Sequence, residues 1–306
     1  MFHHCLRIIA AATIIAGLLI SSAEAQETSN AKAPRAAKND DATSAPGGTH
    51  KVVFKKFPDG DLFMEIDLPK GDGPFPIVIY IHGGGWSAAQ APSQFKPQSL
   101  HMAQLGVAGA RILYRGKQRG GFDETMADVM DAIDYVRQNA AKYHFDMKRL
   151  ALAGGSAGAH LAGIAAQRTT ECVAFVGFNG LYDVIEIGAG KFGSEGSIAG
   201  KDVPFLGKMT PERQKEVSAM RQIKTPPPAT ILFHGTADTT IDPQQSVRFA
   251  EAVKKKGGQA EVKLYDGEVH GFFNQKKYTE TLNEMEKFLL AIFQMTPSPG
   301  SLSGAR

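Results

Sequence analysis

The feature that most constrains the fold of this chain is residues 154–158, which read Gly-Gly-Ser-Ala-Gly. They lie between an apolar run, 150–153, and a helical pattern of small residues, 157–166. A G-x-S-x-G sequence between a strand and a helix can form a sharp turn that exposes the serine hydroxyl. Glycines two residues either side are needed because the turn is strained and the neighbouring backbones pass close together. The chain is therefore expected to place Ser156 on a strand-turn-helix unit.

Apolar strand patterns alternate with helical patterns along most of the chain. The first two strands, 51–57 and 62–68, are separated by Pro-Asp-Gly-Asp and predict an antiparallel hairpin. Further strands are expected at 77–81, 107–114, 149–153, 173–178, 230–234 and 262–265. The clearest helical patterns cover 123–142 and 278–295. Apolar strands alternating with helices indicate the α/β class, with a mainly parallel sheet covered by helices on both faces.

The two ends of the chain are expected to lie outside this domain. Arg7, the apolar run 8–20 and an Ala-Glu-Ala sequence at 23–25 predict a signal peptide over 1–25. An uncleaved anchor is the less favoured alternative, because the run is short for a membrane span. Residues 26–49 and 296–306 are expected to be a disordered linker and a flexible tail. We therefore expect a secreted or periplasmic protein with one folded domain over 50–295 and no stable membrane anchor after cleavage.

One segment, 180–225, interrupts the alternation of strands and helices. It carries glycines, charges and weak periodicity, and it ends before three consecutive prolines. Long insertions of this kind are often lids or binding loops. A surface helix followed by a loop explains the same pattern equally well.

The composition argues against several classes of function. Lys and Arg number 34 against 31 Asp and Glu, and no arginine-rich stretch supports nucleic-acid binding. The basic run 254–256 is expected to end a helix. Export would leave Cys172 as the one cysteine, and its apolar strand predicts a buried thiol rather than a reactive one. No H-x-x-x-H pair or cysteine cluster is present, so neither a metal nor a cofactor is expected.

A serine hydroxyl becomes a strong nucleophile only when a base takes its proton, and that base is usually a histidine oriented by a carboxylate. In sheets of this type the chain order is Ser, then Asp or Glu, then His. His270 fits best, because it follows the last expected strand and precedes the final helix. His160, four residues after Ser156, is expected to pack beside the turn. The histidines at positions 3 and 4 would leave with the signal peptide, and those at 50 and 101 do not follow a suitable strand.

Asp238 is the expected orienting carboxylate, because it closes His-Gly-Thr-Ala-Asp directly after the strand 230–234. Asp242 competes with it, but Asp242 precedes a proline and an apolar-periodic segment and so is typical of a helix N-cap. Asp183 and Asp266 are weaker alternatives.

Residues 82–86, His-Gly-Gly-Gly-Trp, follow the strand 77–81. Backbone N–H groups aimed at a developing oxyanion each lower the barrier by roughly 3 kcal/mol, and consecutive glycines let the backbone approach it. Ala157, directly after Ser156, supplies another N–H group. Trp86 is the only tryptophan and either walls an acyl pocket or anchors this loop in the core.

Together these motifs resemble the α/β-hydrolase superfamily from residue 77 to the last helix, and among its subfamilies the secreted bacterial carboxylesterases related to acetyl-xylan and feruloyl esterases. The resemblance implies Ser156 as nucleophile, His270 as general base and acid, and Asp238 as the residue that orients His270. It also implies Gly84, Gly85 and Ala157 as oxyanion-hole donors.

Three further features bear on this resemblance. Asp128 matches an acidic position that such esterases carry, expected to be structural. The more distant lipase-like relatives continue with Leu-Ala-Pro after the strand that corresponds to 107–114 and carry Asp-Pro-Leu at their acid. This chain has the charged stretch 116–120 and no Asp-Pro-Leu, which favours the carbohydrate-esterase-like group.

The expected function is a serine carboxylesterase acting on short-acyl or aryl esters, on polysaccharides or on small molecules. An amide hydrolase of the formamidase or peptidase kind could use the same triad. A catalytically silent binding protein on this fold is the third hypothesis, and the presence of every motif in the expected order counts against it.

Overall fold

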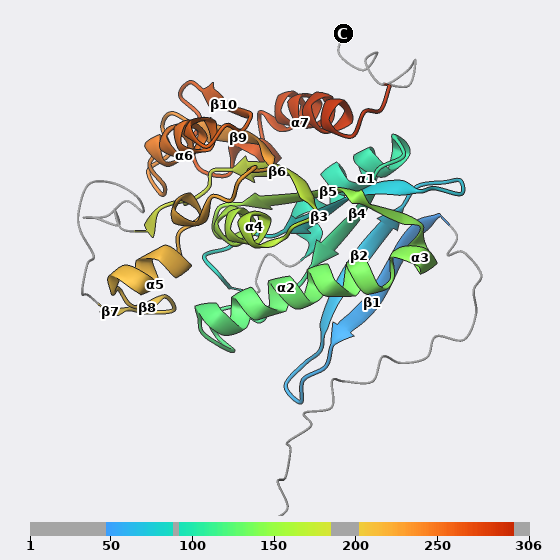
Figure 1. Cartoon of the computed structure of the whole chain (residues 1–306), viewed down its shortest axis with the longest axis horizontal. Helices are drawn as coiled ribbons and strands as arrows, with labels where there is room; N and C mark the ends of the chain where they lie inside the picture. Colours follow the sequence, from blue (N-terminus) through green and yellow to red (C-terminus); the bar gives the residue numbers. More distant parts are fainter. Residues whose placement is uncertain (1–46, 88–91, 185–201, 297–306) are drawn as a thin grey trace, which may run out of the picture. The chain divides into compact units, whose positions relative to one another are not determined.

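The structure is a computed structural model, and it describes residues 47–87, 92–184 and 202–296. Its centre is an eight-stranded sheet in the order β1-β2-β4-β3-β5-β6-β9-β10 (Figure 1). The first two pairings are antiparallel and the other five are parallel. The expected α/β class, with a mainly parallel sheet behind an N-terminal hairpin, is confirmed.

The strands have the following bounds: β1 Gly48–Lys55, β2 Leu62–Leu68, β3 Phe75–Ile81, β4 Ala108–Ile112, β5 Phe145–Gly155, β6 Cys172–Phe178, β9 Ala229–Gly235 and β10 Ala260–Tyr265. The main helices are α1 Lys96–Gln104, α2 Phe122–Gln138, α3 Ala140–Tyr143, α4 Ala157–Arg168, α6 Gln244–Lys255 and α7 Tyr278–Ile292. The segment after β6 adds β7 Asp202–Val203, β8 Gly207–Lys208, α5 Pro211–Glu216 and the 3-10 turn η3 Ala219–Gln222.

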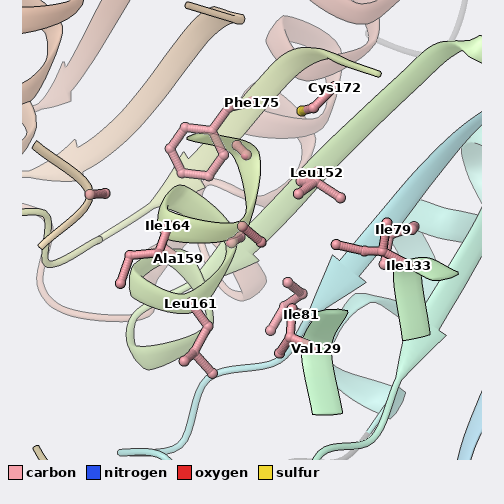
Figure 2. Packing of buried hydrophobic residues seen from close by; sticks show 14 of the residues in the cluster. Ile79, Ile81, Val129, Ile133, Leu152, Ala159, Leu161, Ile164, Cys172 and Phe175 are labelled. Atoms are coloured by element: carbon pink, nitrogen blue, oxygen red, sulfur yellow. The ribbon is translucent and has the colours of Figure 1, made fainter. Parts of the chain in front are cut away.

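Helices cover both faces of the sheet, as the apolar strands require. On one face the buried cluster includes side chains of α2, α4 and α6, and on the other it includes side chains of α1 and α7. Figure 2 shows the first of these layers, where Val129 and Ile133 of α2 lie with Ile79 and Ile81 of β3. The inner parallel strands are therefore buried on both faces, whereas the edge strand β10 exposes Glu261 and Leu264.

Cys172 belongs to this core (Figure 2). Its Sγ donates to the carbonyl oxygen of Ala174 at 3.2 Å, and burial raises the pKa of the thiol to about 12. The thiol is therefore protonated and packed, so the prediction of a buried, unreactive cysteine is confirmed.

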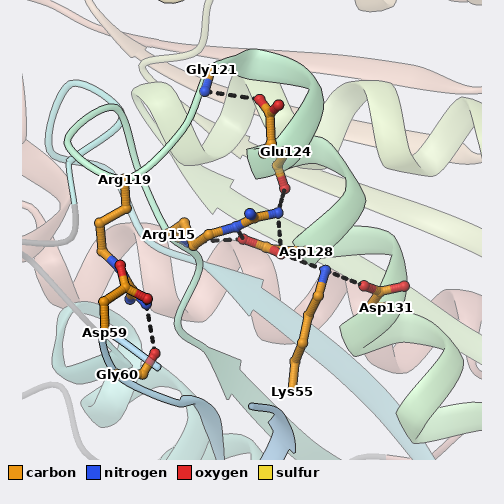
Figure 3. A network of polar contacts seen from close by, with 9 residues as sticks. All are labelled: Lys55, Asp59, Gly60, Arg115, Arg119, Gly121, Glu124, Asp128 and Asp131. Carbon is orange, nitrogen blue, oxygen red and sulfur yellow. Dashed lines mark hydrogen bonds and ion pairs between the residues drawn. The ribbon is translucent and has the colours of Figure 1, made fainter. Parts of the chain in front are cut away.

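Asp128 joins the hairpin to the first long helix (Figure 3). Its buried carboxylate accepts a hydrogen bond from Lys55 Nζ of β1 at 2.8 Å. It also accepts hydrogen bonds from the backbone N–H and the side-chain Nε of Arg115, at 3.1 and 2.8 Å. Two cations and a backbone donor compensate the buried charge, as such a charge requires. The charged stretch after β4 is part of the same region, since Arg119 pairs with Asp59 in the hairpin turn at 2.7 Å.

Some element bounds differ from the sequence predictions. The helix predicted over 123–142 breaks at Asn139 into α2 and α3. Asn139 has φ −105° and ψ 14°, and its side chain donates to the carbonyl oxygen of Tyr135 at 2.8 Å. Asparagine competes for backbone partners in this way, which a hydrophobic pattern does not reveal. The strand predicted at 149–153 begins earlier, at Phe145, and the last helix ends at Ile292 rather than at residue 295.

The predicted signal peptide lies outside the described residues, as do most of the linker and all but the first residue of the tail. Among the residues that the structure describes, none of the helices is long and apolar enough to span a bilayer. Of the segment 180–225, residues 185–201 lie outside the description. Its remainder contains a two-stranded hairpin, β7 and β8, followed by the short helix α5.

Candidate active site

Ser156 lies on the sharp turn between β5 and α4, with φ 55° and ψ −121°. Its backbone N–H donates to Phe178 O at the end of β6, at 2.8 Å. A Cβ on Gly154 would lie 2.3 Å from Gly158 O, and a Cβ on Gly158 would lie 2.1 Å from Ile81 O. No side chain fits at these distances, so both glycines are required for the turn that presents the hydroxyl.

Three residues far apart in sequence meet at the carboxyl ends of β5, β9 and β10. Ser156 Oγ lies 2.9 Å from His270 Nε2, and His270 Nδ1 lies 2.7 Å from Asp238 Oδ2. Because a carboxylate can only accept, Nδ1 of His270 carries the proton and Nε2 is free to accept from the serine hydroxyl. This is the tautomer that a general base acting on Ser156 requires.

The carboxylate of Asp238 is buried and fully engaged. Its Oδ1 accepts the backbone N–H groups of Thr240 and Ile241 at 2.8 and 3.0 Å. Burial alone would raise its pKa, but hydrogen bonds from His234 and His270 outweigh burial and hold the pKa of Asp238 well below its ordinary value. Asp238 therefore stays ionised wherever His270 can act as a base.

Two partners of Asp238 were not singled out from the sequence. His234 Nε2 lies 3.2 Å from Asp238 Oδ2 and 3.1 Å from Ile241 O, while its Nδ1 lies 2.8 Å from Ser246 Oγ. Asn179 Nδ2 donates to the same Oδ2 at 3.2 Å. His234 lies near the end of the buried strand β9, and Asn179 directly follows the buried strand β6. A polar side chain at the end of a buried strand is the signal that could have found them.

The competing residues have other partners. Asp242 Oδ1 accepts the N–H of Gln244 and so supports the start of α6, but the N-cap position is Pro243, one residue later than predicted. Asp183 pairs with Arg221, and Asp266 accepts from Thr236. Away from the site, His101 pairs with Glu286, and His50 lies on β1.

The glycine loop after β3 packs directly against the turn that carries Ser156. A Cβ on Gly83 would lie 2.6 Å from Gly155 O, and Gly84 and Gly85 have φ of 104° and 60°. Gly83 N donates to Gln94 Oε1 at 2.6 Å, and the next two glycines line the cavity beside Ser156. Ala157 lines the same cavity at the first turn of α4, where backbone N–H groups have no partner within the helix.

Gln94 was also missed from the sequence, and it connects two loops of the site. While its side chain holds Gly83, its carbonyl oxygen accepts Asn274 Nδ2 at 3.2 Å. Asn274 in turn accepts Gln98 Nε2 at 2.7 Å. The glycine loop and the segment after His270 are thereby tied together through amides, which hydrophobic patterns do not predict.

His160 packs beside the serine turn, as expected. Its Nδ1 accepts the indole Nε1–H of Trp86 at 3.1 Å, and its Nε2 donates to Val217 O at 2.6 Å. Burial lowers the pKa of His160 to about 4, so the ring is neutral at physiological pH. With both nitrogens engaged and no contact to Ser156 Oγ, His160 does not serve as the base.

The buried histidines predict that the fold loses stability as the pH falls. Burial lowers the pKa of both His82 and His160 to about 4, whereas an unfolded chain titrates near 6.5. Below pH 6.5 the unfolded chain therefore binds more protons, and the free energy of unfolding should fall by up to about 3 kcal/mol per histidine at about pH 4. Urea unfolding at about pH 7 and pH 4 measures this fall. The variant His160→Gln should show a smaller one, and an undiminished fall in that variant would contradict the assignment.

The site opens into a cavity of about 430 Å³, a size suited to a small organic group. Its apolar wall includes Trp86, Leu181, Ile241 and Phe273. Its polar lining is mostly neutral: Gln94, Thr240, Asn274 and Gln275. Within the described ranges, no cluster of His, Cys, Asp or Glu has the arrangement of a metal site.

Comparison with known proteins gives a consistent result. The model of the family described as BD-FAE matches residues 64–253. A probable isoprenylcysteine alpha-carbonyl methylesterase of Arabidopsis thaliana is 27% identical over 253 residues, which is 75% of this chain and 52% of the relative. Esterase LipQ of Mycobacterium tuberculosis is 27% identical over 72% of this chain and 54% of its own length. The chain thus spans about half the length of the curated relatives it matches.

A solved structure matches over nearly its whole length. Esterase 2 of the planctomycete Thermogutta terrifontis superposes with a TM-score of 0.72 at 29% identity, covering 82% of this chain and 95% of that one. The same esterase has been solved phosphorylated by paraoxon, and with propionate or butyrate bound.

Proposed function

The chain belongs to the BD-FAE family and has the α/β-hydrolase fold, and from this premise we propose that it is a serine carboxylesterase. The observation that carries the proposal is the pair of hydrogen bonds that join Ser156 to His270 and His270 to Asp238. The esterase names of the relatives support the same reaction class.

In the proposed mechanism, Ser156 Oγ attacks the ester carbonyl carbon while His270 Nε2 takes the hydroxyl proton. The carbonyl oxygen becomes an oxyanion held by the N–H groups of Gly84, Gly85 and Ala157. When the intermediate collapses, the bond to the alcohol oxygen breaks and His270 returns its proton to that oxygen. Water then attacks the acyl carbon while His270 Nε2 takes a proton from it. The bond to Ser156 Oγ breaks and His270 returns that proton to Oγ, which releases the acid and restores Ser156.

In every step of the reaction, Asp238 acts on the substrate only by way of His270. Its carboxylate holds the proton on Nδ1 and stabilises the imidazolium that forms when Nε2 accepts the serine proton. Because five donors fix this carboxylate, it does not have to reorganise during the reaction.

For the substrate we propose short-acyl or aryl esters of neutral alcohols. A cavity of about 430 Å³ suits a short acyl group, and the titratable residue among those that line it is His270. The propionate- and butyrate-bound forms of the Thermogutta esterase support the same acyl range. Esters on polysaccharides are the preferred natural substrates, supported by the neutral amides of the lining and by the signal peptide expected at 1–25, which would make the enzyme secreted or periplasmic.

Matched ester and amide substrates test the reaction class. The nitrophenyl ester of butyric acid should be hydrolysed far faster than the corresponding nitroanilide, and the rate should depend on Ser156. Faster turnover of the amide would replace the esterase by an amide hydrolase on the same triad. Acids released from acetylated and feruloylated polysaccharides, measured by liquid chromatography, then define the natural ester.

A further inference from the structure

We propose that Phe205, on the surface hairpin that follows β6, sets the acyl-chain preference of this enzyme by holding Trp86 in the cavity wall. The proposal rests on the esterase function proposed above and adds a specificity-determining residue outside the cavity. It uses the hairpin β7–β8 and the segment that follows it.

Trp86 transmits this effect because it faces both the cavity and the hairpin. Trp86 lines the cavity beside Gly85 and Ala157. Phe205 stacks on that indole with the ring centroids 5.2 Å apart and an interplanar angle of 29°, yet Phe205 is not among the residues that line the cavity. The position of the indole, and with it the depth of the cavity, therefore depends on a ring behind it.

Both stacked residues have unusual backbone conformations. Trp86 has φ 59° and Phe205 has φ 76°, in the left-handed region that bulky residues rarely adopt. Such conformations persist only where the surrounding structure enforces them, and they concentrate at ligand-binding sites. Because both Trp86 and Phe205 have such a conformation and their rings are in contact, we infer that the surrounding structure enforces the stack itself.

The hairpin is fixed to the domain independently of this stack. Phe205 O accepts the backbone N–H of Phe122 at 2.9 Å, at the start of α2. Arg213 donates to Leu206 O at 2.6 Å and to Asp123 at 2.7 Å. Removal of the Phe205 ring should therefore change the support of Trp86 while leaving the hairpin in place.

His160 supports the indole by a polar contact. It accepts the indole N–H at 3.1 Å. Its other ring nitrogen donates to the carbonyl oxygen of Val217, the C-cap residue of α5. His160 is thus a positioning residue, since it acts on the substrate only through Trp86.

The chemistry of the reaction identifies the Trp86 side as the acyl side. The leaving alcohol oxygen must face His270 Nε2 to receive its proton, which places the alcohol beside the segment Gly271, Asn274 and Gln275 that follows His270. The carbonyl oxygen faces Gly84 and Gly85. The acyl chain then extends toward the remaining apolar wall, which Trp86 and Leu181 form.

A chain-length series tests the proposal. In Phe205→Ala the indole should recede, so kcat/KM for the nitrophenyl octanoate relative to the acetate should rise by about tenfold or more, the scale on which apolar pockets discriminate added methylenes. Phe205→Leu should give a smaller change in the same direction. Phe63→Ala, which truncates a half-buried ring on β2 outside the cavity, is the matched control and should leave the ratio unchanged.

The single tryptophan supplies a second readout. In Phe205→Ala and in His160→Leu, the emission of Trp86 should shift to the red and be quenched more readily by acrylamide than in the wild type. Both changes should be smaller in His160→Gln than in His160→Leu, because glutamine retains an acceptor for the indole N–H. His160→Leu should also alter the chain-length ratio more than the acetate kcat, as expected of a residue that acts through Trp86.

The outcomes separate this inference from the proposed function. If the wild type hydrolyses the series and reacts with paraoxon, but Phe205→Ala changes all chain lengths by one factor with unaltered Trp86 emission, the inference is wrong and the esterase function stands. If the wild type neither hydrolyses the esters nor reacts with paraoxon, the proposed function fails first.

Discussion

Ser156→Ala should lower kcat for nitrophenyl butyrate by about a millionfold while the protein remains folded, the scale seen when the nucleophile of a serine hydrolase is removed. The reason is geometric, because Ser156 Oγ lies 2.9 Å from His270 Nε2, within hydrogen-bond distance of the base. Alanine removes that oxygen and leaves the glycine packing of the turn untouched. Initial rates at saturating ester, with thermal unfolding of each variant, measure the effect.

The matched control for this variant is Ser93→Ala, an exposed serine that precedes Gln94 in the turn Pro92–Phe95. Its kcat should stay within a few-fold of the wild type. A loss of less than about a hundredfold in Ser156→Ala would mean that another group attacks the ester, and the triad would have to be reassigned.

Asp238→Asn should lower kcat by about ten thousandfold, because it changes which nitrogen of His270 carries the proton. Oδ1 of Asp238 accepts two backbone N–H groups, so the asparagine should keep its oxygen there and turn its NH₂ group toward His270. Nδ1 would then accept and Nε2 would carry the proton, which leaves no acceptor for the hydroxyl of Ser156. The residual kcat of the variant, measured over a range of pH, checks this expectation.

Asp242→Asn is the control for this second variant, since Asp242 lies four residues further on and accepts the N–H of Gln244 at the start of α6. Asparagine caps helices about as well as aspartate, so both activity and stability should remain near those of the wild type. A comparable loss of activity in the two variants would show that the effect comes from disturbing the loop rather than from the proton on His270.

Much of this fold could be predicted because its signals are local. Strands such as β3 and β6 are short apolar runs, and the antiparallel hairpin is marked by the turn sequence Pro-Asp-Gly-Asp. The turn at Ser156 was predictable for a different reason, since glycines at 154 and 158 are imposed by contacts shorter than any side chain allows. Asn139 shows the limit, because one side-chain hydrogen bond ends a helix whose apolar periodicity continues.

The residues that surround the triad were harder to predict because their roles depend on single polar contacts made by the folded chain. Asn179 reaches Asp238 from the end of another strand, Gln94 holds Gly83 across the glycine loop, and His234 contacts Asp238 four residues further on. Such contacts leave no periodic pattern. The same holds for Phe205, whose importance depends on a ring contact with a loop more than a hundred residues earlier.

The acyl and alcohol preferences could not be predicted from the motifs. The cavity is assembled from the loop after β3, the turn before α1, and the segments after β6, β9 and β10. Under the proposed function, the glycines and the triad supply the ester-cleaving chemistry, whereas the choice of ester would rest on lining side chains such as Trp86, Leu181, Asn274 and Gln275. Those side chains share no spacing rule, so their juxtaposition becomes visible only in the folded chain.

The most direct test of the central claim is to locate the covalent adduct formed with paraoxon. Mass spectrometry of the digested wild-type protein should find one diethylphosphoryl group per chain, on Ser156, with loss of esterase activity in proportion to labelling. Ser156→Ala should take up no label, and Ser93→Ala should be labelled fully. A stoichiometric adduct on another residue, or labelling that persists in Ser156→Ala, would contradict the assignment of Ser156 as the nucleophile.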